Sequence, residues 1–239
     1  GRSDVNVRRI RYPRTNAYLV DSGTHRILVD SGIAGLTRPI EDAVGDAGNQ
    51  PDLLLLTHTH YDHAGNAASV QKRYGAGICV HGAGAEALAG GYSAFPAGAT
   101  GLGRFVAGVA RVFGARGSNL ETCESEIVLG RPDDSDNETT PRSFDLHEHG
   151  FPGVAVHVPS HSRDSLAFVA DDGSCFCGDV LFNLVPWSLM PPFADSPRRL
   201  HAHWRALLAS GGRYFYPGHG APFGRERLER FVERRAGRS

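Results

Sequence analysis

A histidine-rich heptapeptide, THTHYDH at positions 57–63, constrains this chain more than any other feature of its sequence. Three imidazoles and one carboxylate fall within six residues, and zinc, iron and related ions bind such side chains. The apolar run at 53–56, behind Pro51, predicts a short buried strand directly before it. Because the loop can turn His58 and His60 toward one point and Asp62 and His63 toward a neighbouring one, it suits two metals better than one. We therefore predict a metal site rather than a solvated surface loop.

The length and charge of the chain limit its class. With 239 residues it can bury the core of one α/β domain, and we expect a single domain over residues 1–239. The formal net charge of −1 provides no overall field for nucleic acid or an anionic membrane, so neither is an expected partner. No apolar run reaches membrane-spanning length and the N-terminus has no signal-peptide pattern, so the default expectation is a cytoplasmic protein. A leader removed by cleavage would leave no trace in these residues.

The four cysteines, at positions 79, 123, 175 and 177, are too few for a disulfide scaffold in a chain of this size. Cys175 and Cys177 alternate as in a strand, which points both thiols to the same face of a sheet. Their one-residue spacer is not the spacing of a zinc ribbon. Cys79, Cys175 and Cys177 are therefore predicted to lie in the core.

Helical and strand patterns alternate along the chain, which predicts a layered α/β fold. Strands are expected at 16–20, 25–29, 53–56, 77–80, 143–146, 154–158, 165–169, 174–177 and 214–216, and helices at 39–47, 67–74, 197–208 and 225–235. Residues 82–118 differ, since they are rich in glycine and alanine. Within them Phe105, Val109 and Phe113 share one helical face, which indicates either a helix packed on the core or a lid over the metal site.

Three further metal-capable residues follow apolar strand patterns at a short distance: His161, Asp179 and His219. We expect each of them on a loop at a strand end, where rigid scaffolds place functional groups. Asp30 ends the 25–29 strand, and its expected role is to hydrogen-bond a ligand loop or a ligating histidine, with a turn cap as the alternative.

With these residues in place, the chain resembles the metallo-β-lactamase-fold hydrolase superfamily from Asp30 to His219. The resemblance implies an αββα sandwich, in which two mixed sheets lie face to face with helices outside. It also implies a metal held by His58, His60 and His161, and a second held by Asp62, His63 and His219. Asp179 would bridge the two ions.

The implied cofactors are two divalent ions, with zinc expected and iron or manganese as alternatives. The implied activity is hydrolysis of an ester-like bond by hydroxide shared between the ions, with Asp62 as the catalytic carboxylate. Gly178 to Phe182 is similar to the GDTLF of glyoxalase II, but the Gly-Cys-Gly-Arg that follows there is absent. Few residues follow His219, so the helical glutathione-binding domain of full-length glyoxalase II has no counterpart here. We therefore expect glutathione not to be the substrate. Quorum-sensing lactonases often carry tyrosine where this chain has Phe182.

The expected substrate is a small thioester, lactone or ester with a hydrophobic part, because Trp187 and several prolines follow Asp179. Candidate pocket residues are Ser162, Arg163, Ser165, Asn183, Trp187 and Met190. The alternatives are a mononuclear iron persulfide dioxygenase, a β-lactamase-type amide hydrolase and a non-catalytic metal-binding protein.

Overall fold

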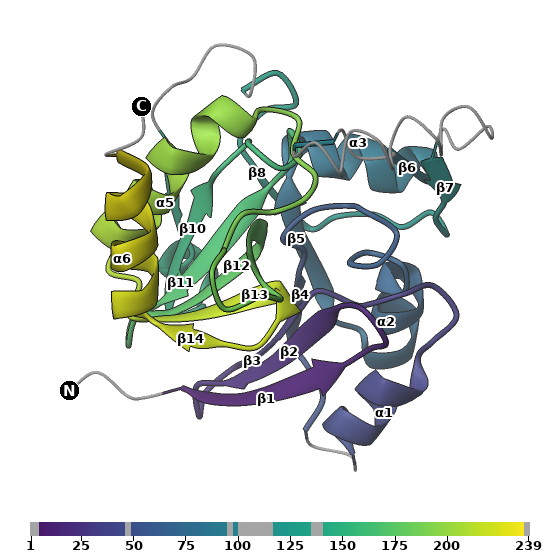
Figure 1. Cartoon of the computed structure of the whole chain (residues 1–239). Helices are drawn as coiled ribbons and strands as arrows, with labels where there is room; N and C mark the ends of the chain where they lie inside the picture. Colours follow the sequence, from purple (N-terminus) through teal and green to yellow (C-terminus); the bar gives the residue numbers. More distant parts are fainter. Residues whose placement is uncertain (1–4, 46–48, 95–97, 100–116, 135–140, 237–239) are drawn as a thin grey trace. The chain divides into compact units, whose positions relative to one another are not determined.

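The computed structural model describes residues 5–45, 49–94, 98–99, 117–134 and 141–236. The chain divides into two compact units, the first made of residues 1–95 and 116–134 and the second of residues 96–115 and 135–239. Each unit contains one six-stranded mixed sheet with helices packed against it (Figure 1). The single domain over 1–239 and the lid at 82–118 stay predictions, and the expected helix around Phe105 lies outside the described residues.

The sheet of the first unit has the strand order β1-β2-β3-β4-β5-β8. These strands are β1 (Asn6–Arg11), β2 (Asn16–Asp21), β3 (Arg26–Val29), β4 (Leu53–Leu55), β5 (Gly77–His81) and β8 (Ile127–Leu129). Strands β1, β2 and β3 form an antiparallel meander, and β3, β4, β5 and β8 run parallel. Since parallel strands end at the same edge of a sheet, the segments after β3 and β4 start from one edge. That edge carries Asp30 and the heptapeptide.

Three helices of the first unit, α1 (Arg38–Val44), α2 (Ala67–Tyr74) and α3 (Gly82–Gly90), pack on one face of this sheet. Ile40, Val70 and Leu88 of these helices join the core cluster that contains Leu54 and Ile78 of the sheet. Helix α2 has the bounds predicted from sequence and is capped by Gly75, which adopts the left-handed conformation favoured by glycine. A separate two-stranded sheet joins β6 (Tyr92–Ala94) to β7 (Gly117–Asn119).

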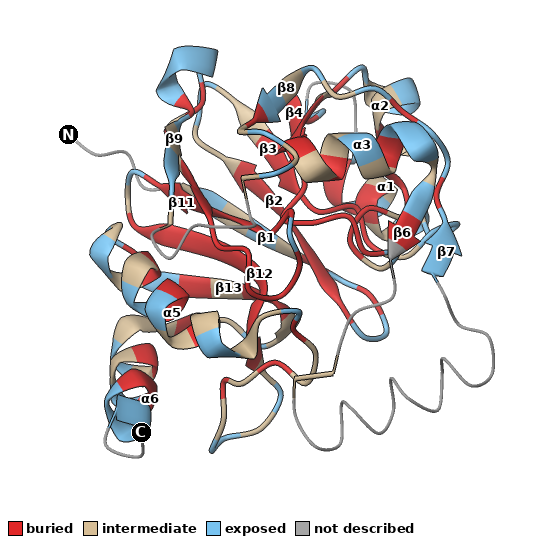
Figure 2. Ribbon diagram, turned by 90° about the horizontal axis from the view of Figure 1, so that it is seen from above, coloured by how far each residue is buried: buried red, intermediate tan, exposed pale blue. Residues whose placement is uncertain are grey.

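The sheet of the second unit has the order β14-β13-β12-β11-β10-β9 and is antiparallel except for the pair β12 and β13. Its strands are β9 (Ser143–Asp145), β10 (Gly153–His157), β11 (Leu166–Ala170), β12 (Ser174–Asn183), β13 (Tyr214–Gly220) and β14 (Phe223–Gly224). Its helices are α5 (Leu200–Ala209) and α6 (Arg225–Ala236), with short 3-10 helices η1 (His147–His149) and η2 (Pro197–Arg199). Helices α5 and α6 contact each other and bury Trp204 and Phe231 against the sheet, while their outer faces are exposed (Figure 2).

The two mixed sheets with their helices confirm the predicted α/β class. All four cysteines are buried and none of them forms a disulfide, and Cys175 and Cys177 belong to the same core cluster, as expected. Among the described residues, no helix is both long enough and apolar enough to cross a bilayer.

Two placements predicted from sequence are wrong, because Asp179 and His219 lie inside strands β12 and β13 and not on loops after them. Glycine at 178 suggests a strand end, but here its φ of 50° permits an irregularity within the strand. The pairing of β12 with β13 shifts register between Phe176 and Gly178 and again between Gly178 and Phe182. The strand continues afterwards, so the irregularity re-aims Asp179 without ending the sheet.

Candidate metal centre

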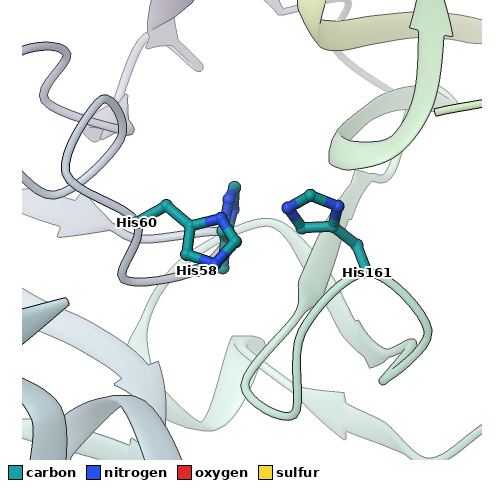
Figure 3. Close-up of side chains that lie close together, drawn as sticks. All are labelled: His58, His60 and His161. Atoms are coloured by element: carbon teal, nitrogen blue, oxygen red, sulfur yellow. The ribbon is translucent and has the colours of Figure 1, made fainter. Parts of the chain in front are cut away.

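The loop that follows β4 brings the four metal-capable side chains of the heptapeptide together in the first unit. The ring centroids of His58 and His60 are 4.6 Å apart, and those of His58 and His63 are 4.2 Å apart. Ligand atoms of His58 and His60 lie within 4.8 Å of each other, and so do those of Asp62 and His63. Figure 3 labels His58 and His60 on this loop and His161 on the loop after β10.

Asp30 organises this loop from the end of β3. Its carboxylate accepts hydrogen bonds from the backbone N–H of Thr57 at 2.8 Å and from Nδ1 of His63 at 2.8 Å. Since Nδ1 of His63 carries the proton, Nε2 is the nitrogen left with a lone pair for a metal. The hydroxyl of Thr15 lies 3.4 Å from this Nε2. The expected hydrogen bond between Asp30 and a histidine of the heptapeptide is confirmed.

Asp30 also determines the protonation of His58, through Thr57. The Thr57 hydroxyl lies 3.0 and 2.9 Å from the two carboxylate oxygens of Asp30, which can only accept its single proton. In the 3.1 Å contact between this hydroxyl and Nδ1 of His58, the imidazole must therefore be the donor. Nε2 of His58 is then the metal-capable atom. Sequence reasoning missed Thr57, although its place directly before the first histidine was a usable signal.

Asp30 holds a backbone conformation that side chains usually avoid. Its φ is 62°, and it is the one non-glycine residue with positive φ among the residues that the structure describes. Burial raises the pKa of Asp30, while the charge of His63 and the hydrogen bonds from His63 and Thr57 oppose that rise. Such a strained, buried and fully hydrogen-bonded carboxylate is typical of a residue that orients a functional site.

The second unit brings its three candidate ligands together around one carboxylate oxygen. Oδ2 of Asp179 is 3.6 Å from Nε2 of His161 and 3.2 Å from Nε2 of His219. Nδ1 of His161 donates a hydrogen bond of 2.9 Å to the carbonyl of Phe193, so its Nε2 is available as a ligand. The ring of Phe182 stacks on that of His219 with centroids 4.4 Å apart and planes at 15°. Phe182 therefore supports an imidazole of the site.

Burial separates the candidate ligands into two groups. His58, His60, His63, His161 and Asp179 are buried. The side chains of Asp62 and His219 retain 16% and 12% of their accessible surface. Asp62 is therefore the more accessible of the two ligand-set carboxylates, which suits a group that exchanges protons with a substrate or water.

The donor set fits divalent cations of the zinc and iron type. It consists of imidazole nitrogens and carboxylate oxygens, and at His58, His63 and His161 a hydrogen bond fixes the tautomer that leaves Nε2 available.

The structure also places other residues considered from sequence. The Ser162 hydroxyl donates to Asp164 at 2.7 Å and lies 2.8 Å from the Ser165 hydroxyl, so these residues shape the turn after His161. Arg163 is exposed, and its carbonyl accepts a hydrogen bond from Nε2 of His157. His81 caps helix α3 by accepting from the N–H of Ala83.

The described fold and ligand groups agree with the comparisons to known proteins. The family model of the metallo-beta-lactamase superfamily matches residues 12–219, and the chain belongs to this superfamily. Most of its members are metal-dependent hydrolases.

Curated relatives are distant from this chain. A hydroxyacylglutathione hydrolase from Aeromonas hydrophila is 26% identical over 192 residues, which cover 80% of this chain and 55% of that protein. The chain thus spans little more than half the length of the first relatives that it matches. The human acyl-coenzyme A thioesterase MBLAC2 is 26% identical over 237 residues, covering 92% of this chain and 77% of that protein.

A solved structure shares the fold at low identity. The archaeal metallo-beta-lactamase superfamily protein ST1585 from Sulfolobus tokodaii matches with a TM-score of 0.63 and 17% identity, covering 98% of this chain and 87% of that one.

Proposed function

We propose that this protein is a dinuclear metal-dependent hydrolase that cleaves a thioester bond in a small molecule with a hydrophobic part. In this proposal one ion takes His58, His60 and His161, a second takes Asp62, His63 and His219, and Asp179 is shared. Zinc is the proposed metal.

The observation that carries the proposal is the position of Asp179. One carboxylate oxygen lies within 3.6 Å of Nε2 of both His161 and His219, which suits a carboxylate shared between cations. The supporting observation is the pair of hydrogen bonds from His63 and Thr57 to Asp30, since metal-ligating histidines commonly donate their other nitrogen to a carboxylate.

Two relatives favour a thioester over a lactone or a simple ester. Glutathione and coenzyme A are thiols, so both relatives' names describe removal of an acyl group from a thiol carrier. One solved structure that shares the fold is a B3 metallo-beta-lactamase, so the substrate test also includes a β-lactam.

The chain's own residues have separable tasks in this reaction. When bound, divalent ions lower the pKa of a coordinated water from about 16 toward 7 and polarise a carbonyl. Asp30 and the Phe193 carbonyl hold His63 and His161 in the required tautomer. Asp62 accepts the proton of the attacking water and returns it to the leaving sulfur. Water adds to the acyl carbon, the carbon–sulfur bond breaks, and a carboxylic acid and a thiol leave.

The first test is metal analysis of the full chain purified without added metal. About two ions per chain are expected from a dinuclear site. One iron per chain would favour a persulfide dioxygenase. A chain without bound metal would contradict the proposal and favour a non-catalytic protein.

The second test is a hydrolysis panel of acyl thioesters, lactones, aryl esters and a β-lactam. We expect thioester cleavage that is lost on chelation and falls at least about 100-fold in Asp62→Asn. Asp42→Asn is the matched control, because Asp42 is an exposed carboxylate of α1 outside the ligand set. Full activity of Asp62→Asn would contradict the proposed role of this residue.

A further inference from the structure

A pocket in the second unit is lined by none of the candidate metal ligands. It is a pocket of about 810 Å³ that includes Trp187 and Ser188 after β12, His201 of α5, and Phe231, Arg234 and Arg235 of α6. This volume is in the range of small-molecule sites, which is roughly 300–1,000 Å³. Three aromatic rings and two guanidinium groups in one pocket indicate a ligand that is both planar and anionic.

Trp187 is the most exposed large apolar side chain of the described residues, with 74% of its surface accessible. Its segment is nevertheless anchored. The N–H of Phe182 donates to the Leu189 carbonyl at 3.0 Å, and the Arg227 guanidinium donates to the carbonyls of Val185 and Pro186 at 3.0 and 3.1 Å. An indole that is exposed on an anchored turn offers a preformed face for stacking a base or another planar ring.

The charge of the pocket has one sign. Arg234 and Arg235 line it, and no acidic side chain does so among the described residues. Arg235 lies over the ring of Phe231 with its Cζ 5.6 Å from the centroid, and its Nη1 is 3.5 Å from Sδ of Met190. Arg234 is exposed and makes no salt bridge within the part of the chain that the structure describes.

Arginines in the last turn of a helix also stabilise the helix dipole, and this role needs no ligand. That role does not explain why a solvent-exposed tryptophan on an anchored turn lines the same pocket. Guanidinium groups bind phosphate through paired hydrogen bonds, and aromatic faces bind nucleobases through stacking.

We propose that this pocket binds the nucleotide part of a substrate, with the base stacked on Trp187 and phosphate groups paired with Arg234 and Arg235. This deepens and rests on the proposed function, because it identifies the thiol carrier of the thioester as a nucleotide-bearing thiol such as coenzyme A. Phe182 supports His219 at the base of the turn that carries Trp187, so one segment serves both the pocket and a candidate ligand.

Intrinsic fluorescence tests the binding step directly. The chain has two tryptophans, and Trp204 is buried with its N–H donating to the Val180 carbonyl at 2.7 Å. Quenching of the solvent-exposed emission therefore reports on Trp187. We expect saturable quenching of the full chain by adenosine 3′,5′-bisphosphate, and binding weaker by about tenfold or more for adenosine, which lacks phosphate.

Matched variants localise the effect. Arg234→Gln is expected to weaken binding of the bisphosphate by roughly tenfold. Arg230→Gln removes the same charge from the same helix outside the pocket and is expected to leave binding unchanged. Equal weakening in both variants, or no quenching of the unmodified protein at millimolar bisphosphate, would overturn the proposal.

Kinetics separate this proposal from the proposed function. Arg234→Gln should raise KM for an acyl-coenzyme A and leave kcat unchanged. It should not change KM for a thioester without a nucleotide. If the protein hydrolyses thioesters but the bisphosphate does not quench Trp187, the nucleotide-binding proposal is wrong and the proposed function stands. Quenching in a protein that hydrolyses no thioester would support the pocket and overturn the proposed function.

Discussion

The Asp30 carboxylate accepts a hydrogen bond of 2.8 Å from Nδ1 of His63, and both residues are buried. The same carboxylate accepts from Thr57, which in turn accepts from His58. One buried anion thus sets the tautomers of two histidines of the heptapeptide.

The first prediction concerns a substitution, Asp30→Asn, that removes the charge of that anion without disturbing the backbone. Asparagine tolerates the positive φ of residue 30, so Asp30→Asn changes the hydrogen bonding and not the backbone strain. Zinc affinity should fall about 10- to 100-fold, because metal ligands lose affinity when their hydrogen-bonded partners are changed. Competition with a chromogenic chelator measures this. Asp42→Asn should retain the affinity of the unmodified protein, and an unchanged affinity in Asp30→Asn would show that Asp30 does not orient the ligands.

The second prediction concerns stability at acid pH. Burial lowers the pKa of His203 to about 4, with smaller effects from His157 and Arg199. Because the pKa in the folded state lies below the ordinary 6.5, this stability is fully present above pH 6.5 and is lost as pH falls toward 4. Urea unfolding measures this. Between pH about 6.5 and 5, the unmodified protein should lose about 2 kcal/mol more free energy of unfolding than the His203→Leu variant loses.

His147 provides the control of opposite sign for this experiment. Its hydrogen bonds with Asp171 and Asp145 raise its pKa, so its contribution is present below pH 6.5 and is lost as pH rises. His147→Gln should therefore reduce stability at low pH more than at high pH. If His203→Leu and the unmodified protein show the same pH dependence, His203 does not remain neutral in the folded state.

The third prediction uses two glycines of nearly equal φ. Gly220 (φ 95°) directly follows His219, and a Cβ there would lie 2.2 Å from the backbone oxygen of Asn183. A Cβ added at Gly211 (φ 93°) would instead point into open space. Gly211→Ala should lose about 1–2 kcal/mol of unfolding free energy, the penalty for left-handed backbone, and Gly220→Ala should lose at least about 2 kcal/mol more. Thermal unfolding of both variants measures the difference, and equal losses would mean that β13 can shift away from Asn183.

The fourth prediction concerns the thiols. Burial raises the pKa of Cys79 to about 12 and also raises that of Cys175, and burial with Glu126 and Glu121 raises the pKa of Cys123 to about 11. Thiolates are the reactive species, so a chromogenic disulfide should react slowly with the folded protein. It should react with four thiols after unfolding in denaturant. Rapid reaction of two or more thiols in the folded protein would show that the core opens readily.

The sequence by itself determined the class of this protein and its candidate ligands. Period-two and helical patterns fixed the bounds of α2 and the buried position of Cys175, because local spacing and burial follow from hydrophobicity. The heptapeptide gathers four donors within one loop, so their proximity needed no information about the rest of the chain.

Tertiary structure alone decided how the donors are oriented. Asp30 and Thr57 are 27 residues apart and meet because β3 and β4 pair in parallel. Strand β1, with three arginines, was not predicted, since its pairing with β2 overrides a weak local pattern. The sequence pattern predicts Asp179 after a strand, but it lies within β12, because Gly178 admits an irregularity in the pairing of β12 with β13. Residue type and spacing specify which atoms can bind a metal, whereas strand register and hydrogen bonds between distant residues determine which nitrogen carries the proton and where each carboxylate points.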